Sequence, residues 1–253
     1  MEEQFNIQLA QMQPITLEQM GSIRLMNRID KKYVTNINML LKLLNLCKED
    51  YFVQEINGVR ICPYHTVYFD TEDHKFYFDH QYGHCPRRKV RVRTYVQTGM
   101  SFLEVKKKNN HGRTKKTRIP IDSELATYSE STDSFLKEAC GLAMSDMHRV
   151  VENRFQRITL VNKAKTERLT MDFQIRFHNF ETDFRCDTGD LAVIELKRDG
   201  LAYSPVKEML RELRIKENGF SKYCIGTVLT NPYIKQNRFK KKMVKFRKCL
   251  LTA

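Results

Sequence analysis

The chain has 253 residues, of which 41% are hydrophobic and 29% are charged, so a substantial core is expected and extended disorder is excluded. Its 44 Lys and Arg residues against 30 Asp and Glu give a formal net charge of +14. This excess indicates a polyanionic partner, either nucleic acid, an anionic membrane or a phosphate-rich substrate, although a basic surface can also serve solubility alone.

The seven cysteines are odd in number and include no C-x-x-C pair, which is typical of reduced thiols. The first residues, MEEQFNIQLAQ, have neither a basic start nor an apolar stretch, so we expect no signal peptide. No apolar run approaches the roughly 18–20 residues that a membrane-spanning helix needs. We therefore expect a soluble cytoplasmic protein in which residues 1–253 form one domain.

Short stretches of alternating hydrophobicity outnumber the helical patterns along the chain. In chain order, strands are expected at 28–34, 64–70, 75–80, 88–97, 101–108, 114–121, 154–161, 168–177 and 191–197. Apolar residues at helical spacing predict helices over 36–48, 131–140, 204–214 and 221–229. Asn36 is suited to cap the first helix, and Ser204 followed by Pro205 is suited to begin the third.

The end of the chain, residues 231–253, forms a strongly basic tail. Within it, Phe239, Met243 and Phe246 recur at helical spacing, which predicts an amphipathic helix over 235–251. Such a helix usually packs its apolar stripe on its own domain, and this is the interpretation we favour. A membrane surface or a nucleic acid is the alternative.

The stretch RRKVRVRTYV, residues 87–96, alternates cations with valines, as a strand with one apolar face does. One face would carry Arg87, Lys89, Arg91 and Arg93 in a column. Neighbouring charges in such a column lie about 6.5–7 Å apart and repel each other, which favours unfolding. A column of this kind indicates that the strand faces a bound anion.

The polar faces of other predicted strands carry further cations, among them Lys32, Lys106, Arg157 and Arg168. Two arrangements of the strands would explain why so many of their polar faces carry cations. The basic faces form an open saddle for nucleic acid, or the sheet closes into a barrel with a basic lumen and helices outside. The amphipathic helices at 36–48 and 204–214 are suited to cover a barrel, so the sequence favours an α+β fold with a cationic tunnel for phosphates.

Several short motifs follow one another in a family-specific order: RIDKKY (28–33), RVR (91–93), FLEVKKK (102–108), GRTKKTRIPI (112–121), FQRITL (155–160), ERLTMD (167–172), VIELK (193–197) and GFSKYCIG (219–226). On these motifs the chain resembles the polyphosphate polymerase domain of the VTC family, within the CYTH or triphosphate tunnel metalloenzyme superfamily. The resemblance implies an eight-stranded antiparallel β-barrel that binds ATP or its triphosphate with Mn²⁺ or Mg²⁺. It also implies transfer of the γ-phosphoryl group to a growing polyphosphate chain.

The resemblance also implies a role for individual residues. Glu195 falls on the metal-binding carboxylate of the family. Catalytic contacts with phosphate are expected from Arg91, Arg93, Lys106, Arg157 and Arg168. Further phosphate contacts are expected from Lys32, Lys115, Ser221 and Lys222, with Lys116 or Arg118 in place of Lys115 because the loop length leaves the register open.

Smaller differences from the family motifs bear on the choice between three functions: a polymerase, a hydrolase and a binding module. Hydrolytic tunnel enzymes carry E-x-E-x-K in the first strand, whereas this chain has Arg28, Asp30 and Lys32 there, which favours the polymerase over a tripolyphosphate or nucleoside triphosphate hydrolase. Phe155 stands where the family often has a tyrosine, and Gly219 stands where it often has a basic residue.

The third alternative is a non-catalytic module that binds polyphosphate or RNA. RNA is disfavoured because few aromatic residues accompany the cations, so no nucleic-acid partner is expected.

Overall fold

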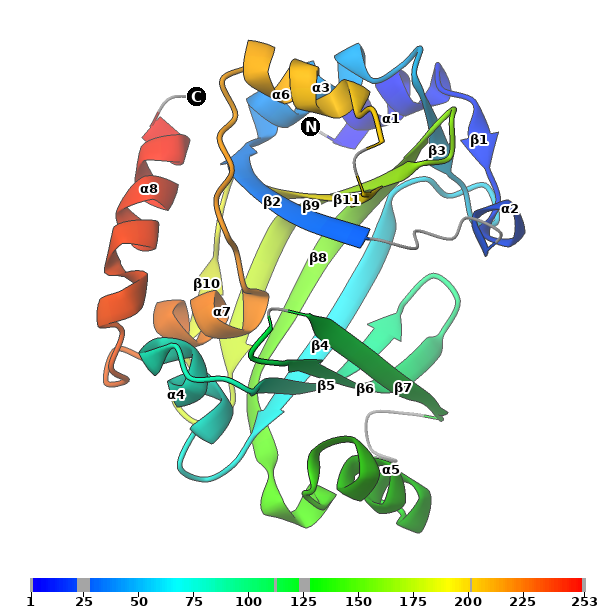
Figure 1. Ribbon diagram of the computed structural model, residues 1–253. Helices are drawn as coiled ribbons and strands as arrows, with labels where there is room; N and C mark the ends of the chain where they lie inside the picture. Colours follow the sequence, from blue (N-terminus) through cyan, green and yellow to red (C-terminus); the bar gives the residue numbers. More distant parts are fainter. Residues whose placement is uncertain (1, 22–27, 112, 123–127, 201, 252–253) are drawn as a thin grey trace.

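The computed structural model in Figure 1 describes residues 2–21, 28–111, 113–122, 128–200 and 202–251. An antiparallel sheet of eight long strands forms its centre and curls into a half-barrel. The strands pair in the order β2, β11, β9, β8, β4, β5, β6, β7. Their bounds are Arg28–Asn36 (β2), Cys62–Asp70 (β4), Arg87–Tyr95 (β5), Met100–Lys108 (β6), Thr114–Ile121 (β7), His148–Asn162 (β8), Glu167–Asn179 (β9) and Leu191–Asp199 (β11).

The antiparallel sheet of eight strands expected from the sequence is confirmed, with one difference in its closure. In the part of the chain that the structure describes, no strand pairing joins β2 to β7. The barrel is therefore a half-barrel whose two edges are not hydrogen-bonded to each other. Three short strands extend the sheet at its margins: β1 (Pro14–Ile15), β3 (Tyr51–Gln54) and β10 (Arg185–Asp187).

Three helices cover one side of the half-barrel, at the top of Figure 1: α1 (Glu2–Ala10), α3 (Ile37–Leu46) and α6 (Pro205–Glu212). Leu43 of α3 and Leu210 of α6 are buried in one apolar cluster with Ile194 and Leu196 of β11. The predicted cap is present, since Asn36 Oδ1 accepts a hydrogen bond of 2.9 Å from the Met39 backbone N–H. The remaining helices are α2 (Leu17–Gly21), α4 (Lys75–Tyr82), α5 (Glu130–Cys140), α7 (Lys222–Thr230) and α8 (Lys240–Leu251), with 3₁₀ turns at Met144–Asp146 and Asn237–Phe239.

The strand expected at 75–80 is wrong, because this segment is the helix α4. Asp70, at the end of β4, accepts hydrogen bonds from the backbone N–H groups of Phe76 (2.8 Å) and Tyr77 (2.9 Å). These two donors belong to the first turn of the helix, where no intrahelical partner exists. A carboxylate that lies before the helix thus supplies the cap, and the apolar residues Phe76 and Tyr77 are buried as adjacent positions of one helical turn.

The basic tail packs on its own domain, as favoured from the sequence. Phe246 of α8 is only 4% exposed, and its ring centroid lies 5.2 Å from that of Phe220. Phe239, just before α8, is also buried. Over the residues that the structure describes, no helix has both the length and the apolar character to cross a membrane.

Candidate phosphate-binding site

Strand register places most of the predicted cations on one face of the sheet. Residues directly opposite each other in an antiparallel pair point to the same face. Arg91 lies opposite Glu104, which in turn lies opposite Arg118. Toward the other edge of the sheet, and on the same face, Lys32 lies opposite Glu195. When the pairing register is followed from strand to strand, it places these residues on the same face: Lys32, Arg91, Arg93, Lys106, Lys116, Arg118, Arg157, Arg168 and Glu195.

This face is the concave one. The alternate residues of the same strands, such as Val90, Leu103 and Val105, are buried with Leu136 of α5 on the outer side. Across the concavity, burial and the charge of Lys32 lower the pKa of Lys106 to about 8. Lys32 belongs to the first strand of the pairing order and Lys106 to the seventh, so only the curl of the sheet brings them within electrostatic reach.

Glu104 of β6 is the first of three largely buried carboxylates that pair with cations on this face. Arg91 donates two hydrogen bonds to Glu104 Oε2, of 2.8 and 2.6 Å, and Lys116 Nζ lies 3.0 Å from Oε1. Although burial opposes ionisation, Arg91, Arg93 and Lys116 lower the pKa of Glu104 to about 2. Glu104 is therefore a permanent anion that orients the planar guanidinium of Arg91.

Asp172 of β9 is the second carboxylate. Arg157 of β8 donates two parallel hydrogen bonds to it, of 2.6 and 2.8 Å, and Lys222 of α7 also donates to it. Although burial opposes ionisation, these two cations hold the pKa of Asp172 well below its usual range. The lysine ties the first turn of α7 to the sheet, so that α7 lies against β8 and β9 and closes one end of the concavity (Figure 1).

Glu195 of β11 is the third carboxylate. It lies between two amines, with Lys32 Nζ at 3.3 Å and Lys197 Nζ at 3.1 Å. Although burial opposes ionisation, the neighbouring cations hold its pKa well below the usual range. Glu195 is therefore ionised at neutral pH, as a metal ligand must be.

Three further cations on this face, Lys89, Arg93 and Lys106, form no ion pair with a carboxylate among the described residues. Arg93 donates a 3.4 Å hydrogen bond to Thr66, and Lys89 donates a 2.9 Å hydrogen bond to Ser221. Burial lowers the pKa of all three. Partly desolvated cations without a counter-ion are stabilised by an incoming anion, so these groups mark the centre of the candidate site.

Aromatic rings support several of these cations. The Arg157 guanidinium lies 4.7 Å from the ring centroid of Tyr64, and Lys222 Nζ lies 4.1 Å from that of Phe155. Arg118 lies 4.3 Å from the ring of Phe102 in the same manner. The site thus contains more aromatic rings than the sequence suggested, and the faces of these rings are covered by the cations. Phe155, which lacks the hydroxyl of a tyrosine, contributes a surface for two cations.

The structure separates Lys115 from the other predicted phosphate ligands. Lys115 pairs with Lys107 on β6, whereas Lys116 pairs with Lys106. Because side chains alternate along a strand, Lys115 points to the outer face and Lys116 to the concave one. Of the alternatives left open by the sequence, Lys116 and Arg118 are the residues brought to the site.

Ser221 lies at the site but has a structural task as well. Its hydroxyl caps α7 by accepting from the Cys224 backbone N–H (3.2 Å) and also accepts from Lys89 Nζ. Arg168 lies on the concave face toward the start of β9, where it donates to the Met20 carbonyl at 3.4 Å. The side chain of Arg28, part of the first-strand motif, lies outside the described residues.

Sequence reasoning did not name Lys89, Tyr68, Glu104 or Asp172 among the site residues. Lys89 was placed in the anion-facing column of its strand, with Arg91 and Arg93, but was not assigned a phosphate contact. Tyr68 is buried on the concave face opposite Arg91, and although burial opposes the shift, Arg91 and other cations lower the pKa of its hydroxyl. Glu104 and Asp172 likewise share strand parity with Lys106 and Arg168, but their pairing with cations of neighbouring strands appears only when the strands are placed side by side.

The residues present fit a divalent metal ion only in part. The Glu195 carboxylate is a hard oxygen ligand of the kind that Mn²⁺ and Mg²⁺ prefer. Over the described residues, however, no group of three or more His, Cys, Asp or Glu side chains is arranged to hold a metal ion. Glu195 can therefore serve as one ligand, and most of the remaining ligands would be phosphate oxygens and water.

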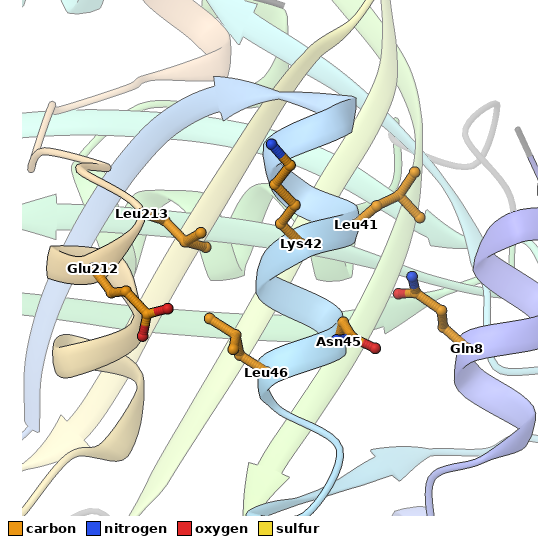
Figure 2. A pocket seen from close by; sticks show the side chains of 7 residues that line it. All are labelled: Gln8, Leu41, Lys42, Asn45, Leu46, Glu212 and Leu213. Atoms are coloured by element: carbon orange, nitrogen blue, oxygen red, sulfur yellow. The ribbon is translucent and has the colours of Figure 1, made fainter.

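A groove also lies on the opposite, helical side of the half-barrel (Figure 2). It runs between α1, α3 and α6, and its one lysine, Lys42, is accompanied by the acidic Glu212. The remaining lining residues are Gln8, Leu41, Asn45, Leu46 and Leu213. This lining lacks the excess of cations that a phosphate site needs, so the concave face remains the candidate site.

Comparison with known proteins agrees with this geometry. A family model described as VTC domain matches residues 27–231. A search of curated proteins gave no match. Among solved structures, a "putative adenylate cyclase" from Bacillus halodurans is 14% identical, with a TM-score of 0.50, and the match covers 77% of this chain and 94% of that one. At this identity the likeness shows a shared fold.

Two further structures are similar at lower scores. A protein from Vibrio parahaemolyticus with the same description is 14% identical, with a TM-score of 0.47 and coverage of 79% of this chain and 97% of that one. A "putative adenylyl cyclase" from Hippeastrum, described as having a dominant triphosphatase activity, is 12% identical, with a TM-score of 0.47 and coverage of 80% of this chain and 97% of that one.

Proposed function

Because the chain belongs to the VTC domain family, we propose that it is an ATP-dependent polyphosphate polymerase whose half-barrel binds the triphosphate of ATP and the growing chain. The observation that carries this proposal is the excess of cations on the concave face. The carboxylates Glu104, Asp172 and Glu195 each form ion pairs with other cations of this face. Among the described residues, Lys89, Arg93 and Lys106 form no ion pair with a carboxylate. One triphosphate needs fewer cations than this face offers, whereas a chain of phosphates can use them all.

Phosphoryl transfer requires positioning and neutralisation of charge more than covalent help from the protein. Arg91 and Arg157 are held in fixed orientations by Glu104 and Asp172, so their outward N–H groups can bind phosphate oxygens without further ordering. Arg93 and Lys106 would bind the transferring group, since their charges are not balanced by protein carboxylates. Lys222 and Ser221, at the first turn of α7, would hold the donor or the acceptor at the end of the concavity.

We assign the metal a supporting role. When bound, Mn²⁺ or Mg²⁺ would withdraw charge from the phosphate oxygens. Glu195 would contribute one ligand, and Lys32 and Lys197 on either side of it would contact the same phosphates. The choice between the two metals is part of the proposal and is open to measurement.

The paired state of the carboxylates favours transfer to phosphate over hydrolysis. Activation of water requires a general base, and a carboxylate whose pKa is strongly lowered is a weak one. Neighbouring cations lower the pKa of Glu104, Asp172 and Glu195. A terminal phosphate is already anionic and needs no such base. Hydrolysis of tripolyphosphate or nucleoside triphosphates on the same face is the second candidate.

The deciding experiment is incubation of the purified protein with ATP and Mn²⁺ or Mg²⁺, followed by separate assays for polyphosphate and for free phosphate. We expect ADP and polyphosphate in matched phosphoryl equivalents and little free phosphate. Arg157→Gln should abolish the product, and Lys115→Gln, on the outer face of the same sheet, should not. Free phosphate equal to ADP would establish the hydrolase instead, and binding of tripolyphosphate without turnover would establish the binding module.

A further inference from the structure

A second group of cations lies near α4, at the end of the concave face, where Arg87 of β5, Arg238 before α8 and Lys242 of α8 all act on the imidazole of His80. Arg238, before α8, packs its guanidinium directly over Gly83, where an added Cβ would lie 2.5 Å from Nη1. Lys242 of α8 reaches the backbone at Gly219 in the same way, where a Cβ would lie 3.3 Å from Nζ. The absence of side chains at these two glycines lets both cations approach the main chain. We call Arg87, Arg238 and Lys242 the exit cluster.

The exit cluster is not neutralised by the protein. Among the described residues, no carboxylate lies within ion-pair distance of its three members, and the acidic residue of α4, Asp79, pairs with Lys75 (3.1 Å) and His84 (4.0 Å) instead. His80, also on α4, faces these cations. Burial and the surrounding cations lower the pKa of His80 to about 2, so it is neutral and adds no charge of its own.

The exit cluster is continuous with the concave site through Lys89. Lys89 lies on the same face of β5 as Arg91, and Arg87 follows two residues away on that face. The Lys89 ammonium donates to Ser221 at the start of α7, two residues after Gly219. The ring of Phe246 packs on Phe220 and so holds α8 against this segment. Burial and the charges of Arg238 and Arg87 lower the pKa of Lys242, so Arg91, Lys89, Arg87, Lys242 and Arg238 form one series of cations within electrostatic reach of each other.

We propose that the exit cluster is a second phosphate-binding site, which holds the distal part of a polyphosphate chain as it leaves the half-barrel. The identity of the occupant rests on the proposed function. A linear chain of phosphates fits because it bears charge along its whole length and has no bases or sugars that would have to pass the crowded start of α7. Arg238 and Lys242 lie outside the matched part of the family, residues 27–231, so this site is a property of the basic C-terminal segment.

The test compares a short and a long anion. Calorimetric titration with tripolyphosphate and with long-chain polyphosphate would be carried out on the wild type and on the double variant Arg238→Gln/Lys242→Gln. The matched control is Lys240→Gln/Lys241→Gln, which removes the same charge from positions of the same segment that do not lie against Gly83 or Gly219. We expect the first variant to lose on the order of tenfold or more in affinity for the long chain and little for tripolyphosphate. The control should lose little for either ligand at ordinary salt.

Three results would overturn the proposal. Equal losses for tripolyphosphate and the long chain would mean that the substitutions disturb the concave site, and equal losses in the control would mean a diffuse basic surface. Tight binding of a single-stranded RNA that depends on Arg238 and Lys242 would make the cluster a nucleic-acid site. Because the titrations involve no turnover, a failure of ATP-dependent synthesis would leave the expected difference intact. Thermal unfolding of each variant would verify that the fold is retained.

Discussion

The guanidinium of Arg157 and the carboxylate of Asp172 face each other across β8 and β9 and share two hydrogen bonds, of 2.6 and 2.8 Å. Lys222 donates to the same carboxylate from α7. Asp172 is 3% exposed, so this group of three has left bulk water. A single buried anion therefore orients the arginine expected to contact phosphate and fastens the helix that closes one end of the site.

Asp172→Asn should destabilise the protein strongly, because it leaves two buried cations without their counter-ion. We expect the free energy of unfolding to fall by about 3–5 kcal/mol. Tripolyphosphate should then raise the melting temperature more in the variant than in the wild type, since the ligand replaces the lost charge. Asp187→Asn is the matched control, because Asp187 forms an exposed ion pair with Arg176 on β9 and should contribute less than about 1 kcal/mol. Equal stability of the two variants would contradict the prediction.

Arg93→Gln should weaken the binding of tripolyphosphate on the order of tenfold to a hundredfold. The reason is that Arg93 has no carboxylate partner in the described part, so its charge is available to the ligand. Arg91→Gln should reduce affinity and also stability, because Glu104 keeps only Lys116. Titration at two salt concentrations is the measurement, with Lys241→Gln at an exposed position of α8 as control. A loss in the control that equals that of Arg93→Gln, and vanishes at high salt, would argue for a diffuse site.

Lys115 and Lys116 offer an internal comparison between the two faces of β7. Lys116→Gln should weaken tripolyphosphate binding several-fold, because it points into the concavity beside Glu104. Lys115→Gln removes the same charge from the next residue and should leave the affinity unchanged. Binding measured on both variants at one salt concentration decides the register, and a larger effect at Lys115 would refute the placement of β7.

Glu195→Gln should keep the fold, bind tripolyphosphate without metal more tightly than the wild type, and lose most metal-dependent turnover. The amide preserves the shape of the side chain but lacks the charge that a hard divalent ion prefers. Removal of an anion between Lys32 and Lys197 should strengthen the binding of phosphate itself. Turnover would be measured against Mn²⁺ concentration. Unchanged turnover at every Mn²⁺ concentration would show that Glu195 only orients the two lysines.

Binding should weaken as the pH rises above about 8. Burial and neighbouring cations lower the pKa of Lys106 to about 8 in the free protein, so Lys106 loses its charge above that pH. An anion binds the protonated form, and each proton taken up on binding changes affinity by up to about tenfold per pH unit. Lys106→Arg stays charged and should reduce the slope between pH 8 and 9, leaving the contribution of Lys222, whose pKa is lowered by burial to about 7. A profile that is the same in the variant would assign the pH dependence to another group.

The sequence by itself determined which residues share a face within each strand. In RRKVRVRTYV the strand period of two separates Lys89, Arg91 and Arg93 from the valines, and no tertiary contact is needed to read this. The start of α3 at Asn36 was equally local, because the cap and the helix are adjacent in the chain. Most of the elements and the cationic side of the sheet followed from such patterns.

Only the tertiary structure decided how these faces meet. The pairing of Lys116, not Lys115, with Lys106 depends on the register of β6 and β7, which two adjacent lysines leave open. Asp70 turns residues 75–82 into a helix by capping it from the preceding strand, against an alternating pattern. Asp172 accepts hydrogen bonds from Arg157 on the neighbouring strand and from Lys222 of α7, which closes one end of the sheet. Lys106 comes within electrostatic reach of Lys32 because the sheet curls. Curl and register arise from the packing of segments far apart in the chain, and a local pattern carries no information about them.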